Sequence, residues 1–423
     1  MSTTASLTIE TLGSQGEGVA EFDGRKIFVP FTLPGERVSA EVDGERAILL
    51  RIEHASPDRI APVCRHFGAC GGCALQHMDW PQYRAFKRSQ VVHALKARGF
   101  TDERVVGDLV GVAPGTRRRA TFGATRAGDG VLLGYHVARS HTILAIDECP
   151  LLSPAIVAAL PKLRQLMELL LSRRGTAEVH VTDNMQGFDV VVTGGVTAID
   201  VARRSTLGGW LARAPGMARL TVDGEQMAAK SIPTITFSEH AVALPPASFL
   251  QAVPEAEAAL VAHVREALAG LKSKERIADL FAGLGAFTLP LAERNEMLAV
   301  EWDRDAVAAL TAAARQPGLR KIEVLRRDLF REPLSARELE PFAAVVLDPP
   351  RAGAQTQSAA LAASTVQTVI AVSCNPATLA RDARTLVDGG YRLDKVTPID
   401  QFVYSPHVEA VAVFNRPKAK RSA

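Results

Sequence analysis

Cys374 is the residue whose chemistry says most about this chain. It stands in the segment 373–376 (Ser-Cys-Asn-Pro), after an apolar run and downstream of a glycine-rich turn and an Asp-Pro-Pro-Arg segment. A thiolate is a soft nucleophile that can add to carbon 6 of a pyrimidine ring, and this addition makes the unreactive carbon 5 nucleophilic. Because Cys374 lies past an expected strand rather than inside it, a reactive thiol is favoured over a small core residue. The pattern predicts a covalent methyltransferase.

Methylation of carbon 5 also needs a base that removes the ring proton after methyl transfer. Glu409 directly precedes an apolar strand expected over 410–414, and His407 lies two residues earlier. A carboxylate in this position is equally compatible with an ordinary charge at a sheet edge. The residues alone therefore leave both interpretations of Glu409 open.

A glycine-rich turn follows a strand expected over 276–281 and opens a helix. Gly283 and Gly285 let the backbone approach a ligand closely at the carboxyl end of that strand. Glu301 ends the next apolar strand, where an acid can bind the hydroxyls of a ribose, and Asp328 follows the strand after that, where an acid can reach an adenine amino group. Because no third glycine follows in the dinucleotide spacing, S-adenosylmethionine is favoured over NAD.

Asp348 begins the Asp-Pro-Pro-Arg segment, after a strand expected over 343–347. The two prolines fix an extended bend beside the expected cofactor. In amino-methylating enzymes a similar Pro-Pro turn carries an aromatic that stacks on the base, whereas Arg351 stands here, so carbon methylation is favoured. The next strand, expected over 369–372, brings Cys374 to the same sheet edge as Asp348 and the glycine turn.

Three of the five cysteines lie within ten residues of one another, with the spacing C-x5-C-x2-C in a glycine-rich stretch. The odd, low count argues against a disulfide framework and favours metal-binding or catalytic roles. Three clustered thiolates and a distant fourth match the ligands of a cubane iron–sulfur cluster, and zinc accepts four sulfurs equally well, with His66 or His77 as possible substitutes. The four candidate metal ligands are Cys64, Cys70, Cys73 and Cys149.

The chain of 423 residues is long enough for two or three domains. Short alternating runs separated by turns predict a small antiparallel, OB-like β-barrel over 1–60. A central α+β region that carries the cysteine loop is expected over 61–250. Residues 251–423 alternate helices and buried strands, which predicts a doubly wound α/β sheet as the catalytic domain.

The net charge of +3 is too small to indicate a polyanionic partner. The basic run 117–119 is compatible with a solvated face or with phosphate contacts, and the run 418–421 with a disordered tail that binds RNA weakly. No apolar stretch approaches the roughly 18 residues of a membrane span, and residues 1–8 lack the features of a secretory signal. We therefore expect a soluble, cytoplasmic protein without a membrane partner, and a monomer.

The segments 373–382, 348–353 and 407–409 resemble the RNA (uracil-5-)-methyltransferases. The resemblance extends over nearly the whole chain. The amino-terminal barrel is similar to a TRAM domain, the cysteine set is similar to the family's [4Fe-4S] ligands, and residues 117–120 fall in its central RNA-contacting region. Because family members with both barrel and cluster act on 23S ribosomal RNA, the resemblance implies that substrate.

The resemblance implies a class I S-adenosylmethionine-dependent methyltransferase and a role for each matching residue. Cys374 would be the nucleophile and Glu409 the general base, and the three clustered cysteines together with Cys149 would hold a structural [4Fe-4S] cluster. The family commonly has asparagine where Ala286 follows the glycine turn, so one hydrogen bond to the cofactor would be missing. The matching cofactor-binding positions are Gln251, Phe281, Glu301 and Asp348, with Asp328 a weaker match.

Other functions stay compatible with the sequence. The same chemistry on a tRNA uridine is one, and cytosine-5 methylation is another, although the second cysteine that such enzymes often carry in the Pro-Pro region is absent. A non-catalytic RNA-binding module or an iron–sulfur redox sensor would use the same elements differently. Binding of S-adenosylmethionine separates the first of these from an enzyme, and spectra that respond reversibly to oxidants identify the second.

Overall fold

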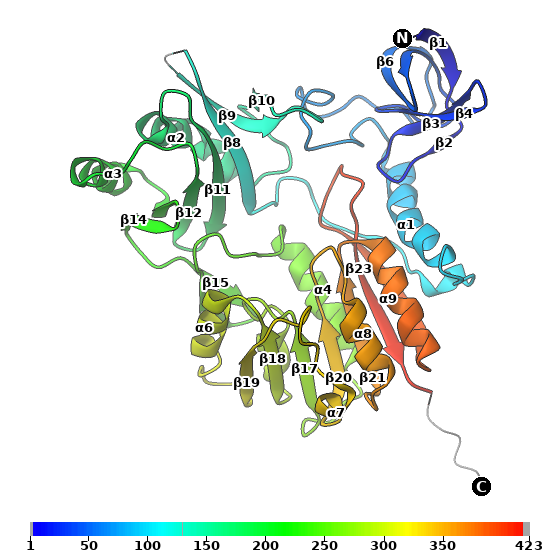
Figure 1. Ribbon diagram of the computed structural model, residues 1–423, viewed down its shortest axis with the longest axis vertical. Helices are drawn as coiled ribbons and strands as arrows, with labels where there is room; N and C mark the ends of the chain where they lie inside the picture. Colours follow the sequence, from blue (N-terminus) through cyan, green and yellow to red (C-terminus); the bar gives the residue numbers. More distant parts are fainter. Residues whose placement is uncertain (1–2, 129, 418–423) are drawn as a thin grey trace.

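The computed structural model describes residues 3–128 and 130–417, which form three regions in sequence order (Figure 1). A small barrel comes first, a central sheet with two helices follows, and a larger α/β domain ends the chain. The basic run 418–421 lies outside the described residues. No helix among the described residues is long and apolar enough to cross a membrane.

The amino-terminal region is the expected small barrel, and its strand pairs are antiparallel except for β4 with β6, which pair in parallel. Its six strands pair in the order β1-β5-β6-β4-β3-β2, and their inward side chains, among them Leu7, Ile27 and Val38, form one apolar core. Gly18 is required where the chain crosses the barrel, because a Cβ atom there would lie 2.1 Å from Thr32 Oγ1. The strands are β1 (Thr3–Thr8), β2 (Thr11–Leu12), β3 (Gly18–Phe22), β4 (Arg25–Val29), β5 (Arg37–Asp43) and β6 (Arg46–His54).

The central region is a seven-stranded sheet in the order β10-β9-β8-β11-β12-β13-β14. Helices α2 (Pro154–Leu170) and α3 (Val201–Arg213) pack on it, and Leu163, Leu166 and Leu170 of α2 have no exposed surface. Its strands are β8 (Arg119–Ala127), β9 (Gly130–His136), β10 (Ile143–Ala145), β11 (Thr176–Asn184), β12 (Gly187–Thr193), β13 (Met217–Val222) and β14 (Glu225–Ala229).

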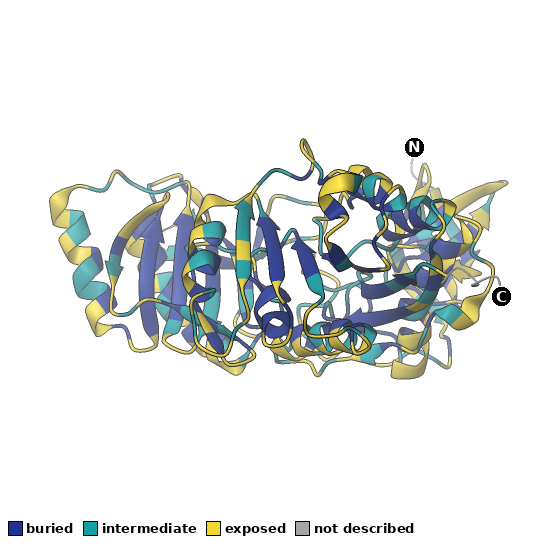
Figure 2. Ribbon diagram, turned by 90° about the horizontal axis from the view of Figure 1, so that it is seen from below, coloured by how far each residue is buried: buried dark blue, intermediate teal, exposed yellow. Residues whose placement is uncertain are grey.

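The carboxyl-terminal region is the expected doubly wound sheet, in the order β19-β18-β17-β20-β21-β23-β22-β7. The inner strands are almost wholly buried between helices whose outer faces are exposed (Figure 2), whereas the edge strands β19 and β7 are only partly covered. The first five in this order run parallel and β23 runs antiparallel to β21. They are β7 (Val110–Gly111), β17 (Arg276–Leu280), β18 (Met297–Glu301), β19 (Ile322–Arg326), β20 (Phe342–Leu347), β21 (Thr368–Ser373), β22 (Arg392–Asp400) and β23 (Glu409–Asn415).

The strand order reverses between β17 and β20, and ligands of open α/β sheets bind at the carboxyl ends of strands at such a reversal. A separate hairpin of β15 (Thr234–Phe237) and β16 (His240–Ala243) packs on α6. The remaining helices are α4 (Pro254–Ala267), α5 (Thr288–Ala292), α6 (Arg304–Ala313), α7 (Ala336–Leu339), α8 (Gln355–Ala362) and α9 (Pro376–Asp388).

Helix α1 (Trp80–Lys96) packs on the catalytic domain, whereas the sequence analysis assigned its residues to the central region. Its residues Val91, Val92 and Leu95 are part of the apolar core of the catalytic domain, and α1 lies alongside α9 (Figure 1). After the short 3-10 helix Glu103–Val105, strand β7 pairs with β22. The helical pattern of 80–99 indicates an amphipathic helix without indicating which sheet it covers. The segment 80–112 thus crosses to the catalytic domain before the central sheet begins.

Candidate active site

Cys374 and Glu409 lie next to each other at one end of the catalytic sheet. Cys374 directly follows β21 and Glu409 begins β23, and the antiparallel register places Ser373 opposite Ala410. This pair is the last of the ladder, and just beyond it Cys374 lies near enough to Glu409 for the charge of Glu409 to raise the pKa of the thiol. Cys374 is half-buried, whereas Glu409 is only 2% exposed. The sequence-predicted nucleophile and base are therefore brought together, 35 positions apart in the chain.

Two glutamines link Glu409 to Asp348, which follows β20. The Gln251 side chain donates to Asp348 Oδ2 (3.1 Å) and accepts a hydrogen bond from Gln401 (2.8 Å). The same Gln401 amide donates to Glu409 Oε2 (2.5 Å). Gln251 was predicted from the resemblance, but Gln401 was not, because no local motif marks it.

Several acidic side chains of the site are buried close to one another. Burial raises the pKa of Asp348, and burial together with the charge of Asp348 raises the pKa of Glu409. Asp279, inside β17, has its pKa raised to about 7, mainly by burial and further by Asp348 and Glu301. Asp279 Oδ2 accepts from Thr288, while Oδ1 has no partner among the described residues. Carboxylates in this setting favour a cationic ligand group.

The Cys374 thiol shares this environment. Burial, followed by the charges of Glu409 and Asp348, raises its pKa to about 11, and the cation of Arg351 opposes this rise. At neutral pH most of the free thiol is therefore protonated. A cation bound near Cys374 would lower its pKa and increase the thiolate fraction.

The glycine turn after β17 has the backbone shape that the sequence predicted. Gly283 and Gly285 have φ of +54° and +92°, and a Cβ on Gly285 would lie 2.5 Å from a methyl carbon of Leu310. The expected strand ends one residue early, at Leu280, because Phe281 has φ +65°. Glu301 stabilises the turn by accepting from the Gly283 N–H (2.9 Å).

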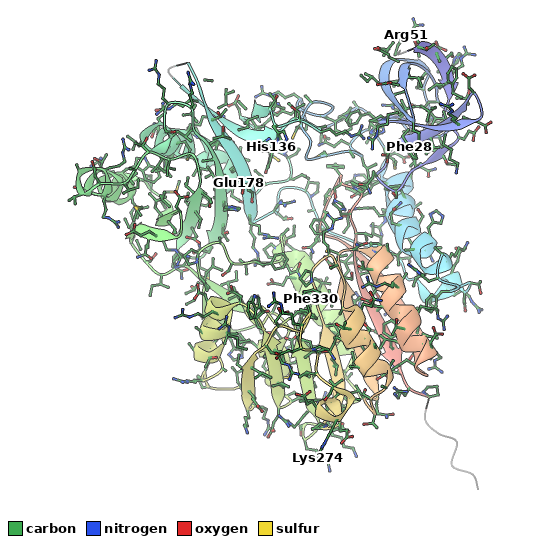
Figure 3. All side chains as sticks on the ribbon, viewed as in Figure 1. Phe28, Arg51, His136, Glu178, Lys274 and Phe330 are labelled. Atoms are coloured by element: carbon green, nitrogen blue, oxygen red, sulfur yellow. The ribbon has the colours of Figure 1, made fainter. Side chains whose placement is uncertain are left out.

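Aromatic rings lie beside the predicted cofactor acids. Phe281 contacts Phe330, with ring centroids 5.4 Å apart, and Phe330 lies at the edge of the catalytic domain that faces the central region (Figure 3). Asp328 accepts from the Phe330 N–H (3.0 Å). Trp302, which follows Glu301, is 57% exposed. The sequence prediction did not include Trp302, Phe330 or Asp279, although each lies within two residues of an acid or inside a motif strand.

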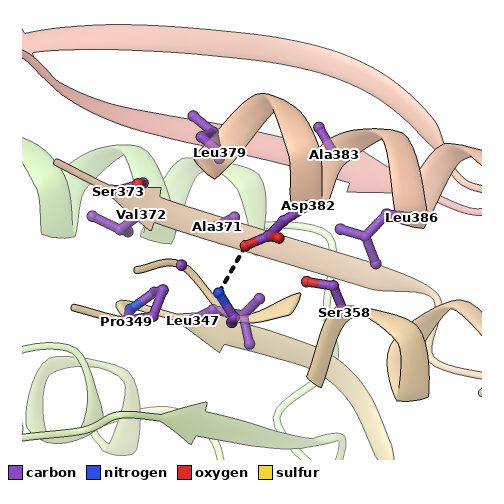
Figure 4. A pocket seen from close by; sticks show the side chains of 12 residues that line it. Leu347, Pro349, Ser358, Ala371, Val372, Ser373, Leu379, Asp382, Ala383 and Leu386 are labelled. Carbon is purple, nitrogen blue, oxygen red and sulfur yellow. Dashed lines mark hydrogen bonds between the residues drawn. The ribbon is translucent and has the colours of Figure 1, made fainter. Parts of the chain in front are cut away.

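The Asp-Pro-Pro-Arg loop is held against α9. Asp382 accepts from the Ala354 N–H (2.7 Å) among apolar side chains of β20, β21 and α9 (Figure 4). The Asn375 side chain donates to the Arg351 carbonyl (3.0 Å). Gly353 has φ +75°, and a Cβ there would lie 2.6 Å from Asp382 Oδ2. The residues that follow Cys374 thus fix the loop that carries Asp348 and Arg351.

The four clustered cysteines line one cavity of about 350 Å³ between the central and catalytic regions. His407, two residues before Glu409, lines the same cavity. Burial raises the pKa of the Cys73 thiol to about 12. Among the residues that the structure describes, no group of three or more His, Cys, Asp or Glu side chains is arranged so that it could hold a metal ion. The four sulfur donors are of the type that an iron–sulfur cluster uses, but the described residues are not gathered into a metal-binding arrangement.

The central residue of the basic run 117–119 is neither exposed to solvent nor free to bind a phosphate. Arg118 is buried and forms an ion pair with Glu257 of α4 (2.6 Å). Arg119 lies over the ring of Phe249, 4.4 Å from its centroid, and Phe249 is 66% exposed two residues before Gln251. A stacked ring and guanidinium therefore stand beside the candidate site.

The chain has the fold of the class I S-adenosylmethionine-dependent methyltransferases, joined to a TRAM domain. The TRAM profile matches residues 3–45, and the profile of the tRNA (uracil-5-)-methyltransferases matches residues 236–417. The chain also resembles the solved tRNA (uracil-54, C5)-methyltransferase of Pyrococcus abyssi, with a TM-score of 0.71, 23% identity, and coverage of 97% of this chain and 99% of that one.

Relatives that match nearly the whole chain show which methyltransferase family it belongs to. An uncharacterized RNA methyltransferase of Mesorhizobium japonicum is 46% identical over 99% of both chains. The 23S rRNA (uracil(1939)-C(5))-methyltransferase RlmD of Halomonas elongata is 33% identical and covers 98% of this chain and 90% of its own. The chain belongs to the RNA (uracil-5-)-methyltransferase family, and it is an RNA methyltransferase.

The acidic site predicts a pH-dependent preference for the charged methyl donor. S-adenosylmethionine carries a sulfonium that S-adenosylhomocysteine lacks. As pH rises from about 6 to about 9, the carboxyls with raised pKa values ionise. The affinity for S-adenosylmethionine should therefore rise relative to the affinity for S-adenosylhomocysteine. The expected rise is roughly tenfold for each carboxyl whose pKa the bound sulfonium lowers by one unit. Calorimetry with both ligands measures this ratio, and a ratio that stays flat would contradict it.

Proposed function

We propose that this protein methylates carbon 5 of a uridine in 23S ribosomal RNA through a covalent bond between Cys374 and carbon 6. The observation that carries the proposal is that Cys374 and Glu409 directly follow and precede Ser373 and Ala410, the last pair of the β21–β23 ladder, so that the charge of Glu409 acts on the Cys374 thiol. Asp348 and the glycine turn lie at the same sheet edge. A nucleophile, a base and a nucleoside-binding turn are the three parts that carbon-5 methylation requires.

The residues divide the reaction between them. The Cys374 thiolate forms a bond to carbon 6, and the electrons of the carbon 5–carbon 6 double bond make carbon 5 nucleophilic. Bound S-adenosylmethionine would supply the methyl group: as carbon 5 bonds to it, the methyl–sulfur bond would break and sulfur would keep the electron pair, leaving S-adenosylhomocysteine. Glu409 then removes the proton of carbon 5, the double bond re-forms, and the thiolate of Cys374 leaves.

Several residues are suited to the cofactor. Asp348, which Gln251 holds by a hydrogen bond, and Asp279, whose Oδ1 has no partner among the described residues, are carboxyls that fit a positively charged sulfur. Glu301 fits the ribose hydroxyls, and Asp328 with the rings of Phe281 and Phe330 fits the adenine. Gly283 and Gly285 allow the close backbone approach. Ala286 packs its side chain against the neighbouring apolar cluster.

Ribosomal RNA is favoured as the substrate by the similarity to RlmD of Halomonas elongata over nearly the whole chain. Phe249 and Arg119 support recognition of an unstacked base, because proteins commonly read flipped RNA bases by stacking on rings and guanidinium planes. The matching family profile is named for tRNA enzymes, so a tRNA uridine is the second candidate.

The substrate assay separates these possibilities. Anaerobically purified protein is incubated with labelled S-adenosylmethionine and with unmodified 23S ribosomal RNA or tRNA, and the methylated nucleoside is identified by mass spectrometry. We expect 5-methyluridine in ribosomal RNA. Label only in tRNA would change the substrate and keep the chemistry. Absence of transfer to both, with retained RNA binding, would favour the non-catalytic module.

We infer that the clustered cysteines bind a structural [4Fe-4S] cluster. All four line one cavity, and a set of four thiols is the donor set of such a cluster, which supports this. Anaerobic preparations should contain about four iron atoms and four sulfides per chain, and Cys73→Ser should lower the iron content and the melting temperature. Zinc in place of iron would contradict the cluster. Activity that follows reversible oxidation would favour the redox-sensor interpretation.

A further inference from the structure

A lysine without exposed surface lies beneath the loop 401–408, which connects β22 to β23. Lys87 is in the middle of α1, and its Nζ lies 2.8 Å from Asp400 Oδ1. Nζ also donates to three backbone carbonyls of this loop. These carbonyls belong to Phe402 (3.1 Å), Ser405 (2.9 Å) and His407.

The surroundings of Lys87 offset the cost of burying its charge: burial lowers the pKa of the ammonium group, and Asp400 opposes this effect. An ammonium group has three donors and no acceptor, and burying it is costly unless it is paired and hydrogen-bonded. Asp400 supplies the counter-charge and the loop carbonyls supply the acceptors. The Tyr83 hydroxyl, one turn earlier on α1, donates to Asp400 and accepts from the Tyr404 N–H (3.0 Å). Helix α1 therefore holds the loop through one charge and several hydrogen bonds.

The loop 401–408 determines the position of Glu409 and of its hydrogen-bond partner Gln401. Its first residue, Gln401, accepts from the Ala252 N–H (3.1 Å). Because a backbone N–H can only donate, this bond fixes the orientation of the Gln401 amide and turns its NH2 group towards Glu409 and Gln251. The loop ends directly before Glu409, and the carbonyl of His407, which Lys87 binds, is two residues from it. A change in the loop would move Glu409 and Gln401 together.

We propose that Lys87 is a positioning residue for the catalytic base: its ammonium group holds the loop 401–408 in the shape that places Glu409 beside Cys374 and aims Gln401 at its carboxylate. This inference rests on the proposed role of Glu409. The contacts of Lys87 are with Asp400 and loop carbonyls, so it acts through the loop rather than on the reacting atoms.

The test is Lys87→Met, which keeps the side chain as far as its Cε position and removes the donors. A misplaced base slows the release of methylated RNA more than the methyl transfer that precedes it. We expect release to slow roughly tenfold to a hundredfold, a covalent protein–RNA complex stable in SDS to accumulate, and the Kd for S-adenosylmethionine to stay within about threefold. Lys96→Met is the matched control, because Lys96 is an exposed lysine of the same helix that pairs with Glu103.

A second variant keeps the test decisive if Lys87→Met folds poorly, since that change leaves Asp400 buried without its counter-charge. Lys87→Met combined with Asp400→Asn removes both charges and leaves an acceptor for Tyr83. It should also accumulate the complex. A folded double variant that releases product at the wild-type rate would overturn the proposal, and so would equal losses of cofactor binding, methyl transfer and release. Glu409→Gln, measured in parallel, shows separately whether the base assignment itself fails.

Discussion

Cys374→Ala is expected to lower methyl transfer to RNA by at least about a thousandfold while the affinity for S-adenosylmethionine stays within a few-fold. The reason is chemical. Without the thiolate no bond forms to carbon 6, and carbon 5 of uracil does not become nucleophilic. Transfer of a labelled methyl group, together with calorimetric titration of the cofactor, measures both quantities on the same preparation.

Cys374→Ser provides the matched control for this result. A hydroxyl keeps the approximate size and polarity of the thiol but is a much weaker nucleophile without an activating base. We expect it to be as inactive as the alanine variant, and neither variant should form a covalent complex with RNA. Full-rate methyl transfer by Cys374→Ala would show that the reaction does not pass through this cysteine.

Glu409→Gln is expected to give the opposite signature, a covalent complex that accumulates. The amide keeps the shape of the side chain and an acceptor for Gln401, but it cannot remove the proton of carbon 5. Methyl transfer in the first turnover should survive, and multiple turnover should fall roughly a hundredfold or more. Gel electrophoresis in SDS with labelled RNA detects the complex.

The pH dependence of release provides an independent check on Glu409. Burial and Asp348 raise the pKa of this carboxyl, and only its ionised form is a base. Release in the wild type should therefore speed up as pH rises through the raised pKa and then level off, and Glu409→Gln should lose this dependence. Glu255→Gln, at an exposed position of α4, should behave as wild type. A Glu409→Gln enzyme that turns over normally would assign the proton transfer elsewhere.

The parts of the site that follow strands were predictable from sequence. Apolar runs locate the strands, and parallel strands bring their carboxyl ends to one edge, so Asp348, Glu301 and Cys374 could be placed before the fold was known. The adjacency of Cys374 and Glu409 was less accessible, because it depends on β23 running antiparallel to β21. Only the resemblance to a family indicated it.

The contacts between distant segments could not be predicted. Gln401 meets Gln251 across 150 positions, and Lys87 meets the loop carbonyl of Phe402 across 315. Neither residue has a local pattern that distinguishes it from a surface polar residue. Arg118 shows the same limit, since a run of three arginines indicates a charged surface, while burial against Glu257 is decided by how two domains pack.

The most direct test of the central claim uses RNA in which uridine is replaced by 5-fluorouridine. Fluorine at carbon 5 leaves no proton for Glu409 to remove, so the reaction stops after methyl transfer with the RNA still bound to the protein. After digestion, mass spectrometry should find a methylated 5-fluorouridine attached to the peptide that contains Cys374. Methyl transfer without any adduct, or an adduct on another cysteine, would contradict the account.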